Sequence, residues 1–228
     1  MGGIVNEQSF ICDPPMTLPE SEDRAAKVQR ILEAAVRVFA RQGFHQSTVA
    51  QVAREAGVAD GTIYNYFRNK DDILIQFFAV RAAQVFARFR STVGQGENAL
   101  DKLRLLLRAH LEEFQRDPDM AVVYETETHQ RRRLAEEQIR SMAKTYQDIL
   151  AEIIEQGQEE GLFRRNLYTG LVKRLVLGAV QETISSWLRS GRPYDLVSMA
   201  DPLVDLLLYG IAQPASGPGG RPAGASPT

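Results

Sequence analysis

Cysteine is almost absent from this chain, because Cys12 is the only one among its 228 residues. A disulfide within the chain is therefore impossible, and a metal site built from several cysteines is excluded. No stretch approaches the roughly 18 consecutive apolar residues that a membrane-spanning helix needs. The N-terminus also lacks a basic segment followed by an apolar one, so we expect no signal peptide. These absences favour a protein of the reducing cytoplasm with no membrane partner.

Motifs of the common enzyme classes are missing as well. The three histidines, His45, His110 and His129, have none of the spacings that hold a metal ion, and neither a GxSxG nor a GxxxxGK segment occurs. Gly94 and Gly96 match a dinucleotide-binding pattern loosely, but that pattern follows a strand and a helix is expected here. We therefore expect a protein that is not an enzyme and has no cofactor or metal site.

The charge of the chain is unevenly distributed. The formal net charge of −2 and the pI near 6.0 do not by themselves suggest a nucleic-acid partner. Within residues 24–70, however, eight Lys and Arg stand against three acids, which is a net charge of +5 and leaves −7 for the remainder. A basic segment of this kind attracts phosphate groups. The pattern therefore favours a nucleic-acid partner for this segment alone.

Apolar residues recur with helical spacing along most of the chain, and no segment alternates with a period of two. We therefore expect an all-α fold of about nine helices. Residues 1–23, which are acidic, and 213–228, which are rich in Gly and Pro, are expected to be disordered. The expected helices are one that ends before Gly43, then 48–56, 60–67, 71–93, 98–116, 119–128, 132–160, 167–189 and 198–211.

The stretch from Thr48 to Phe67, TVAQVAREAGVADGTIYNYF, predicts a helix, a turn and a second short helix. In this layout the second helix enters the major groove of DNA. Ile63 and Phe67 are four residues apart and share one side, so Gly61 and Asn65 point nearly opposite. An outward glycine costs a helix about 1 kcal/mol relative to Ala. It is explained if a DNA backbone must approach closely.

The longer stretch GFHQSTVAQVAREAGVADGTIYNYFRNKDDIL resembles the DNA-binding domain of TetR-type bacterial transcription regulators. The resemblance implies a homodimer on a palindromic DNA operator, with a helix-turn-helix domain at 24–70 and a ligand-binding and dimerisation domain at 71–212. Three side chains have groups suited to phosphates, and four on the second helix of the motif are candidates for reading bases, with an amide on Asn65 that can bond adenine. The predicted DNA-binding residues are Thr48, Tyr66 and Lys70 for phosphates, and Gly61, Thr62, Tyr64 and Asn65 for bases.

Over about residues 24–211 the chain is similar to the fatty-acid-degradation repressors (FadR type) within that family. The segments that carry this similarity are GVADGTIYNYFRNKDDILIQFF, DPDMAVVYETETHQ and LVLGAVQETISSWL with PYDL downstream. The resemblance implies that long-chain acyl-coenzyme A binds the C-terminal domain and releases the protein from operators upstream of β-oxidation genes. One segment departs from the pattern, because Glu127-Thr128-His129-Gln130 stands where those repressors have Glu-Leu-Arg-Gln. Arg131–Arg133 are the alternative basic group.

An acyl chain needs a narrow apolar tunnel, and the coenzyme A phosphates need Arg or Lys near its mouth. The alternative is that the aromatic side chains simply fill the core and the arginines are a solvated run of charge. A rival function is repression of efflux or stress genes with release by amphipathic drug-like ligands. The final two helices are expected to form the dimer interface, through Leu171, Leu175, Trp187, Leu203 and Leu207. The candidate ligand-binding residues are Phe77, Phe78, Arg81, Phe86, Phe89, Arg90, Tyr124, Arg131, Tyr146 and Trp187.

Overall fold

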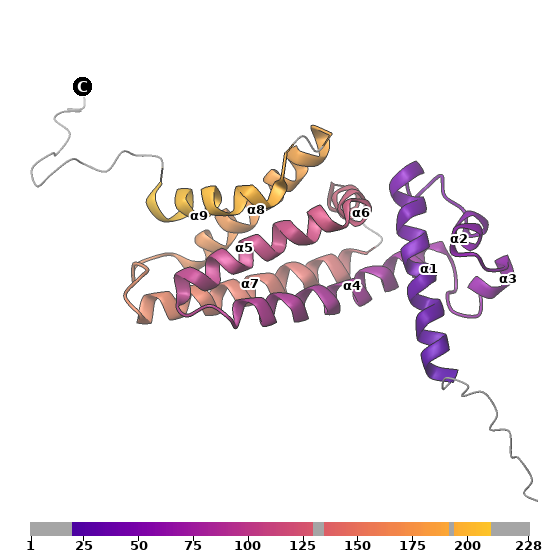
Figure 1. The fold of residues 1–228 in the computed structure, drawn as a ribbon, viewed down its shortest axis with the longest axis horizontal. Helices are drawn as coiled ribbons and strands as arrows, with labels where there is room; N and C mark the ends of the chain where they lie inside the picture. The colour runs from indigo at the N-terminus through magenta and orange to yellow at the C-terminus, as the bar shows by residue number, and fades with distance from the viewer. Residues whose placement is uncertain (1–19, 130–134, 192–193, 211–228) are drawn as a thin grey trace, which may run out of the picture.

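The computed structural model describes residues 20–129, 135–191 and 194–210, and over these ranges every regular element is a helix (Figure 1). The all-α prediction is therefore confirmed, with nine α-helices and one 3-10 helix in the described part. None of these helices is long and apolar enough to cross a membrane. The helices are α1 (Glu20–Gln42), α2 (Val49–Ala56), α3 (Asp60–Ile63), α4 (Lys70–Val93), α5 (Ala99–Arg116), α6 (Pro118–His129), α7 (Glu136–Glu159), α8 (Thr169–Arg189), the 3-10 helix η1 (Leu196–Met199) and α9 (Ala200–Tyr209).

Helices α1, α2 and α3 form a small unit at one end of the molecule (Figure 1). The apolar stripe of α1 that the sequence predicts is buried, with Ile31 and Ala35 fully enclosed. Val52 from α2 and Ile63 from α3 are buried with it, in one continuous core. Burial of this shared apolar surface holds three helices together, one of which is too short to be stable alone.

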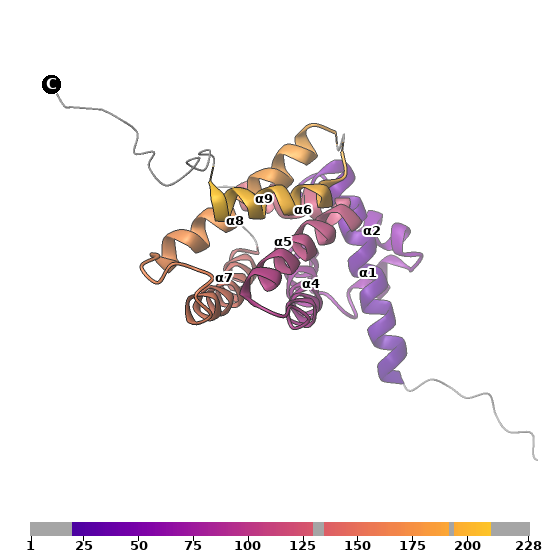
Figure 2. The ribbon, with the colours of Figure 1, turned by 60° about the vertical axis from the view of Figure 1, so that its left-hand side comes forward.

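The remaining helices form a longer bundle. Helices α4, α5 and α7 run side by side, and α8 and α9 lie over α5 on the opposite side from α4 (Figures 1 and 2). The interior is filled by large apolar side chains, with Leu106 and Leu107 of α5 and Leu150 of α7 completely buried. Because α4 begins beside α1 and continues into the bundle, it joins the two units as one continuous rod.

The N-terminal helix starts earlier than the sequence predicts. Residues 20–23 were expected to belong to a disordered arm, but α1 begins at Glu20. Acidic residues favour the first turn of a helix because they complement its dipole, and Asp23 lies there. Asp23 also pairs with Lys27 one turn later at 2.7 Å. The rest of the expected arm, 1–19, and the expected tail, 213–228, lie outside the described residues.

Two other boundaries differ from prediction. The second helix of the helix-turn-helix motif ends at Ile63 rather than Phe67, because its backbone continues in turns in which Asn65 N–H donates to Thr62 and Tyr66 N–H donates to Ile63. The last α-helix begins at Ala200 rather than 198. The 3-10 helix η1 precedes it, and Asp195 caps η1 by accepting from the backbone N–H of Val197 at 3.2 Å.

Candidate DNA-binding surface and effector site

The turn before α2 is held by a reciprocal pair of hydrogen bonds. Thr48 Oγ1 accepts from the backbone N–H of Gln51 at 3.2 Å, and Gln51 Oε1 accepts from the backbone N–H of Thr48 at 2.8 Å. This capping box satisfies two donors that the start of a helix leaves unpaired. The hydroxyl that was predicted to contact a phosphate is therefore also the N-cap of α2. It remains exposed beside the helix N-terminus, where an anion is favoured.

The predicted inward and outward sides of the second helix of the motif are confirmed. Ile63 and Phe67 are buried at 1% and 2% exposure. Gly61 and Asn65 are exposed, and Tyr64 keeps 60% of its surface exposed. Thr62 and Tyr66, the other two predicted residues of this segment, are half-buried at its edges. All five candidates therefore present some surface to solvent, as contact with DNA requires.

Gly61 is not required by the fold of its own chain. Its φ lies outside the left-handed region, and a Cβ added to it would meet no heavy atom within 4 Å. Gly57 differs, because its φ of 67° lies in the left-handed region where glycine is favoured, and its N–H closes the end of α2. The small size of Gly61 is therefore consistent with the close approach of a partner from outside.

Arg24, near the start of α1, makes a cation–π contact with the ring of Tyr66. The guanidinium carbon of Arg24 lies 5.2 Å from the centre of the Tyr66 ring. A cation over an aromatic face at this distance is attracted by the ring's quadrupole. The contact ties the beginning of α1 to the segment after α3, so Arg24 stands at the edge of the predicted DNA-binding surface.

Lys70 has a structural role that the sequence did not reveal. Its Nζ donates to the backbone carbonyl oxygens of Phe44 at 2.7 Å, His45 at 3.3 Å and Ser47 at 2.8 Å. It also lies 4.4 Å from the centre of the Phe44 ring. An ammonium group has three N–H donors, so these carbonyls use all of them. The phosphate contact predicted for Lys70 would have to compete with this set.

Two of the arginines counted in the basic segment pair with the same carboxylate. Arg37 Nε lies 2.9 Å from Glu55, and Arg41 also pairs with the same carboxylate. Hydrogen bonds from Arg41 and then Arg37 hold the pKa of Glu55 below its ordinary value. These ion pairs join α1 to α2. Glu55 is already one of the three acids subtracted in the net charge of +5, so these pairs do not change that total but place part of the positive charge between α1 and α2.

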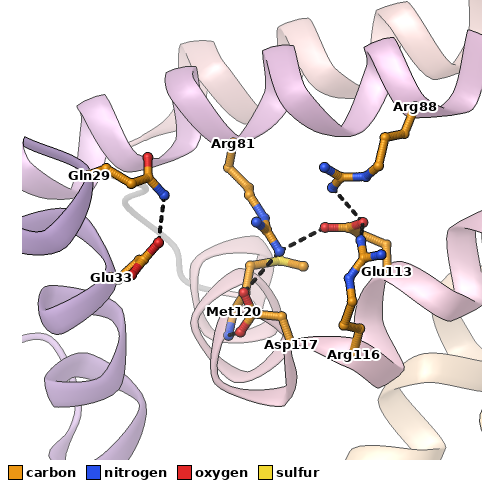
Figure 3. A network of polar contacts seen from close by, with 8 residues as sticks. All are labelled: Gln29, Glu33, Arg81, Arg88, Glu113, Arg116, Asp117 and Met120. Atoms are coloured by element: carbon orange, nitrogen blue, oxygen red, sulfur yellow. Dashed lines mark hydrogen bonds and ion pairs between the residues drawn. The ribbon is translucent and has the colours of Figure 1, made fainter. Parts of the chain in front are cut away.

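A buried carboxylate lies where the two units meet (Figure 3). Glu113 of α5 keeps only 2% of its side-chain surface exposed and is surrounded by three arginines. Arg81 Nη2 lies 2.8 Å from it, Arg88 Nη2 lies 2.6 Å from it, and Arg116 pairs with it from one turn away. Arg81 also bonds Asp117 at 3.0 Å. Arg81, predicted to bind the ligand, is thus held by two acids.

A cleft of about 400 Å³ opens beside this network, between α1 and the first half of α4. Its walls come from Leu32 and Arg37 of α1, Phe77 and Arg81 of α4, and the turn at Asp117 that precedes α6. Figure 3 shows Gln29 and Glu33 of α1 near Arg81 on the other side of this opening. The ion-pair network therefore lies beside the cleft between α1 and the bundle.

Aromatic rings of α4, α5, α6 and α7 form a continuous series inside the bundle. Phe77 and Phe78 begin it, and Phe78 lies against Tyr124 with a centroid separation of 6.3 Å. The centroid separations between the following neighbours are 4.8 to 6.2 Å. We call this set the ring series; its members in order of contact are Phe77, Phe78, Tyr124, Phe114, His110, Tyr146, Phe89 and Phe86.

Six of the ten predicted ligand-binding residues belong to the ring series, and three others that the structure describes lie elsewhere. Arg81 is in the network around Glu113. Arg90 is on the exposed surface of α4 and lies 3.5 Å from Glu152. Trp187 is buried at 3% exposure near the end of α8, where its Nε1 donates to the backbone carbonyl of Tyr194. Arg131 lies outside the described residues.

Sequence reasoning missed His110, Phe114 and Glu113, although a signal was available. His110 and Phe114 continue the apolar stripe of α5 that begins with Leu103 and Leu106. Glu113 follows His110 by three residues and therefore shares its face. A carboxylate on a buried face needs cationic partners. Arg116 is three residues later on α5, a spacing that the sequence does show, but Arg81 and Arg88 are on α4, and the pattern of α5 alone does not identify them.

The final helices present a group of exposed apolar side chains. We call this group the apolar α8–α9 face. It borders a mostly apolar cleft of about 250 Å³ that Leu171 and Leu175 help to line. Leu203 and Leu207 of α9, also predicted here, are half-buried, whereas Trp187 is buried and does not belong to the face. The members are Tyr168 (70% exposed), Leu171 (50%), Leu175 (56%), Leu206 (52%) and Tyr209 (70%).

Comparisons with known proteins agree with these two units. The family described as "Bacterial regulatory proteins, tetR family" matches residues 31–77, and "YsiA-like protein, C-terminal region" matches residues 78–210. The chain is 34% identical over 190 residues to the fatty acid metabolism regulator protein of Bacillus subtilis. The matched stretch covers 83% of this chain and 98% of that protein.

Two solved structures have a similar fold along the same length. One is the transcriptional regulator FadR from Bacillus subtilis in complex with stearoyl-CoA, with a TM-score of 0.76, 35% identity, and coverage of 81% of this chain and 99% of that one. The other is the fatty acid degradation regulator FadR from Bacillus halodurans, with a TM-score of 0.77, 34% identity, and coverage of 81% and 96%. The chain therefore belongs to the TetR family of bacterial transcriptional regulators and is not an enzyme.

Proposed function

We propose that this protein is a homodimeric repressor that binds a palindromic operator and leaves it when long-chain acyl-coenzyme A binds. Release would allow the genes of fatty-acid degradation to be expressed. The observation that carries the proposal is the similarity along almost the full length to regulators named for fatty acid metabolism, one of which is solved with stearoyl-CoA. This similarity includes the C-terminal unit, in which an effector would bind, and is not confined to the DNA-binding unit.

The exposed residues of α3 and of the turn that follows it support the DNA-binding part of the proposal. Asn65 carries an amide suited to adenine, and the methyl of Thr62 is suited to thymine. Tyr64 adds a large exposed ring, and Gly61 leaves room for a close approach. A helix of four residues makes few base contacts, so two copies placed about one DNA turn apart are needed to read an operator.

The apolar α8–α9 face supports the dimer. Monomeric proteins rarely expose so many large apolar side chains together, and such a patch is typical of a protein interface. Leu171 and Leu175 are four residues apart, so they lie on one side of α8 and can pack against the same element of a second copy. A dimer through this face leaves both α1–α3 units free for DNA, because these lie at the far end of α4 (Figure 1).

The ring series supports an acyl ligand. Each methylene of an acyl chain contributes about 0.8 kcal/mol when it leaves water for an apolar environment. The rings lie between α4, α5 and α7, and such sites between helices are where bundles commonly bind ligands. Arg90 is an exposed cation near the α7 side of the bundle and is suited to a coenzyme A phosphate.

The network around Glu113 supports a route from ligand to DNA. Phe114 of the ring series follows Glu113 directly, and Glu113 pairs with Arg81 beside the cleft that separates the bundle from α1. A ligand that shifts α5 would therefore change the ion pairs at this boundary and the position of α1. Coupling of this kind is reciprocal, so operator DNA would weaken ligand binding by the same factor.

Operator release tests the proposal. A DNA sequence selected from a random double-stranded library is labelled, and its fluorescence anisotropy with the protein is followed as acyl-coenzyme A of 12 to 18 carbons is added. We expect release at low micromolar concentration, with coenzyme A alone as the inactive control. Absence of release by every acyl chain, together with release by amphipathic drug-like molecules, would favour an efflux or stress regulator instead.

A further inference from the structure

His110 of α5 and Tyr146 of α7 are two buried polar residues that lie against each other. Their ring centroids are 4.8 Å apart, and they keep only 8% and 3% of their surfaces exposed. Nδ1 of His110 and the hydroxyl of Tyr146 are completely enclosed, yet neither has a hydrogen-bond partner within the described chain. A buried polar group without a partner costs about 1–3 kcal/mol. Two such groups side by side therefore need an explanation.

The other rings in contact with the pair are apolar. The ring of Phe89 from α4 lies 5.7 Å from His110 and 6.2 Å from Tyr146, and Phe114 lies 5.4 Å from His110. Phenylalanine rings cannot satisfy an imidazole nitrogen or a phenol hydroxyl. The pair is thus a small polar spot in the middle of the ring series, with apolar rings on both sides.

The geometry points to a specific role for this pair: His110 and Tyr146 bind the carbonyl oxygen of an acyl thioester, while the flanking rings accommodate its alkyl chain. This inference rests on the proposed acyl-coenzyme A effector and names the residues that recognise its carbonyl group. A carbonyl oxygen has two lone pairs, and the phenol O–H together with an imidazole N–H at Nδ1 supplies two donors. One ligand atom would then satisfy both orphaned groups.

The charge state of the pair favours a neutral carbonyl over a carboxylate. Burial lowers the pKa of His110 to about 4, so the imidazole is neutral at pH 7. Burial also raises the pKa of Tyr146, which keeps its hydroxyl protonated and able to donate. No positive charge is therefore available on these two residues to offset a buried carboxylate, whose burial is costly. A thioester carbonyl is neutral and pays no such cost.

Ligands that differ only in the carbonyl test this assignment. Operator release by wild-type protein is compared for stearoyl-coenzyme A and for S-octadecyl-coenzyme A, a thioether with the same chain length and no carbonyl oxygen. We expect the thioester to act at a concentration about tenfold lower, which corresponds to the loss of one to two hydrogen bonds. Free stearate, which has the same chain with a carboxylate and also lacks the coenzyme A group, is expected to act more weakly than the thioester.

Tyr146→Phe removes only the hydroxyl. We expect this variant to release the operator at similar concentrations of thioester and thioether, so that the wild-type preference disappears. Its unfolding temperature should be equal to or above that of wild type, because the hydroxyl has no partner in the ligand-free protein. Tyr194→Phe, on a partly exposed tyrosine outside the ring series, is the control and should keep the preference.

Each result has one interpretation. If neither ligand releases wild-type protein, the acyl-coenzyme A function fails and this inference fails with it. If both ligands release wild-type protein equally well, or if Tyr146→Phe keeps the full preference for the thioester, the function stands and the role of His110 and Tyr146 is refuted. If stearate acts as well as the thioester, recognition of a neutral carbonyl is refuted.

Discussion

The ammonium nitrogen of Lys70, in the first turn of α4, lies 2.7 Å from the carbonyl oxygen of Phe44 in the turn between α1 and α2. The two residues are 26 positions apart in the chain. Because Lys70 bonds two further carbonyls of the same turn, α4 is fastened to the turn that presents α2. A residue that the sequence pattern assigns to DNA is therefore central to the fold of the DNA-binding unit.

The first prediction concerns Lys70→Ala. We expect the free energy of unfolding to fall by roughly 1.5–3 kcal/mol, the range for hydrogen bonds that involve a charged group. Operator affinity should also fall, because the turn before α2 is loosened, while the slope of log affinity against log salt stays unchanged. Arg68→Ala, which removes a nearby exposed cation, is the stability control. A slope reduced by about 0.9 in Lys70→Ala would instead indicate a direct phosphate contact.

Substitution of Asn65 tests base recognition. Because Asn65 is exposed beside α3 and its amide can bond adenine, Asn65→Ala should change operator preference by about 1–3 kcal/mol at one position of each half-site. Thermal stability should not change. The measurement is binding to a panel of operators with single base changes. Gln95→Ala, on an exposed residue after the far end of α4, is the control. An unaltered preference in Asn65→Ala would remove Asn65 from the base-reading residues.

Glu113→Gln is expected to destabilise the bundle strongly. The change leaves Arg81, Arg88 and Arg116 around an uncharged group, and breaking a buried ion pair costs about 3–5 kcal/mol. We expect the lower part of that range, because Arg88 and Arg116 are partly exposed to water. Urea denaturation measures the effect.

The control for Glu113→Gln is Glu136→Gln, which breaks the exposed pair between Glu136 and Arg140. Exposed pairs of this kind contribute about 0–1 kcal/mol. Each variant removes the negative charge of one ion-paired glutamate. The difference between their losses of unfolding free energy therefore measures the effect of burial. Equal effects of the two changes would mean that the network around Glu113 is not a stabilising feature.

The pKa of His110 predicts how stability depends on pH. Its folded-state pKa of about 4 lies below the ordinary value of 6.5, so the unfolded chain takes up a proton first as the pH falls. The contribution to stability is therefore fully present above pH 6.5 and is lost progressively between pH 6.5 and pH 4. Between pH 7.5 and pH 5 this loss amounts to about 2 kcal/mol, since one pKa unit corresponds to about 1.4 kcal/mol.

The measurement is urea denaturation at both pH values and at one fixed protein concentration, because association also affects stability. In His110→Gln the difference in the free energy of unfolding between pH 7.5 and pH 5 should be smaller by this amount, whatever the substitution does to packing. His45→Gln, which replaces an exposed histidine, is the control. If His110→Gln keeps the wild-type difference, another group is responsible for it.

Leu175→Glu tests the proposed dimer. Leu175 is 56% exposed, so a charge there should leave the folded protomer intact but disfavour contact with an apolar surface. We expect sedimentation to show monomers, and operator affinity to fall at least a hundredfold because a palindrome is no longer read by two copies. Leu162→Glu, on a leucine that is 51% exposed and lies before α8, should remain dimeric. A dimeric Leu175→Glu would place the interface elsewhere.

Patterns within single helices predicted much of this structure. The apolar spacing of α1 identified its buried stripe, and the spacing of Ile63 and Phe67 identified the inward side of the motif's second helix. Asn98 lies three residues before Asp101, the spacing of an N-cap, and it accepts from the backbone N–H of Asp101. These features depend on residues within a few positions of each other, so local geometry determines them.

The candidate site was predicted less completely, because its contacts join separate helices. The sequence predicted that Arg81 binds a ligand, but its position beside Glu113 depends on how α4 packs against α5. It predicted Trp187 at a ligand site and a dimer interface, but Trp187 is buried against the segment before η1 and donates to Tyr194. Neither partner can be identified from spacing along one helix.

The amino-acid sequence alone determined the helical class, the helix-turn-helix motif, the concentration of positive charge between residues 24 and 70, and the resemblance to TetR-type regulators, since these follow from neighbouring residues and their order. Only the tertiary structure decided that Lys70 bonds the turn after α1 and that His110 meets Tyr146 inside the bundle. The reason is physical. Hydrophobic burial sets which faces pack together, and that packing, rather than the pattern of any one helix, brings distant polar groups into contact.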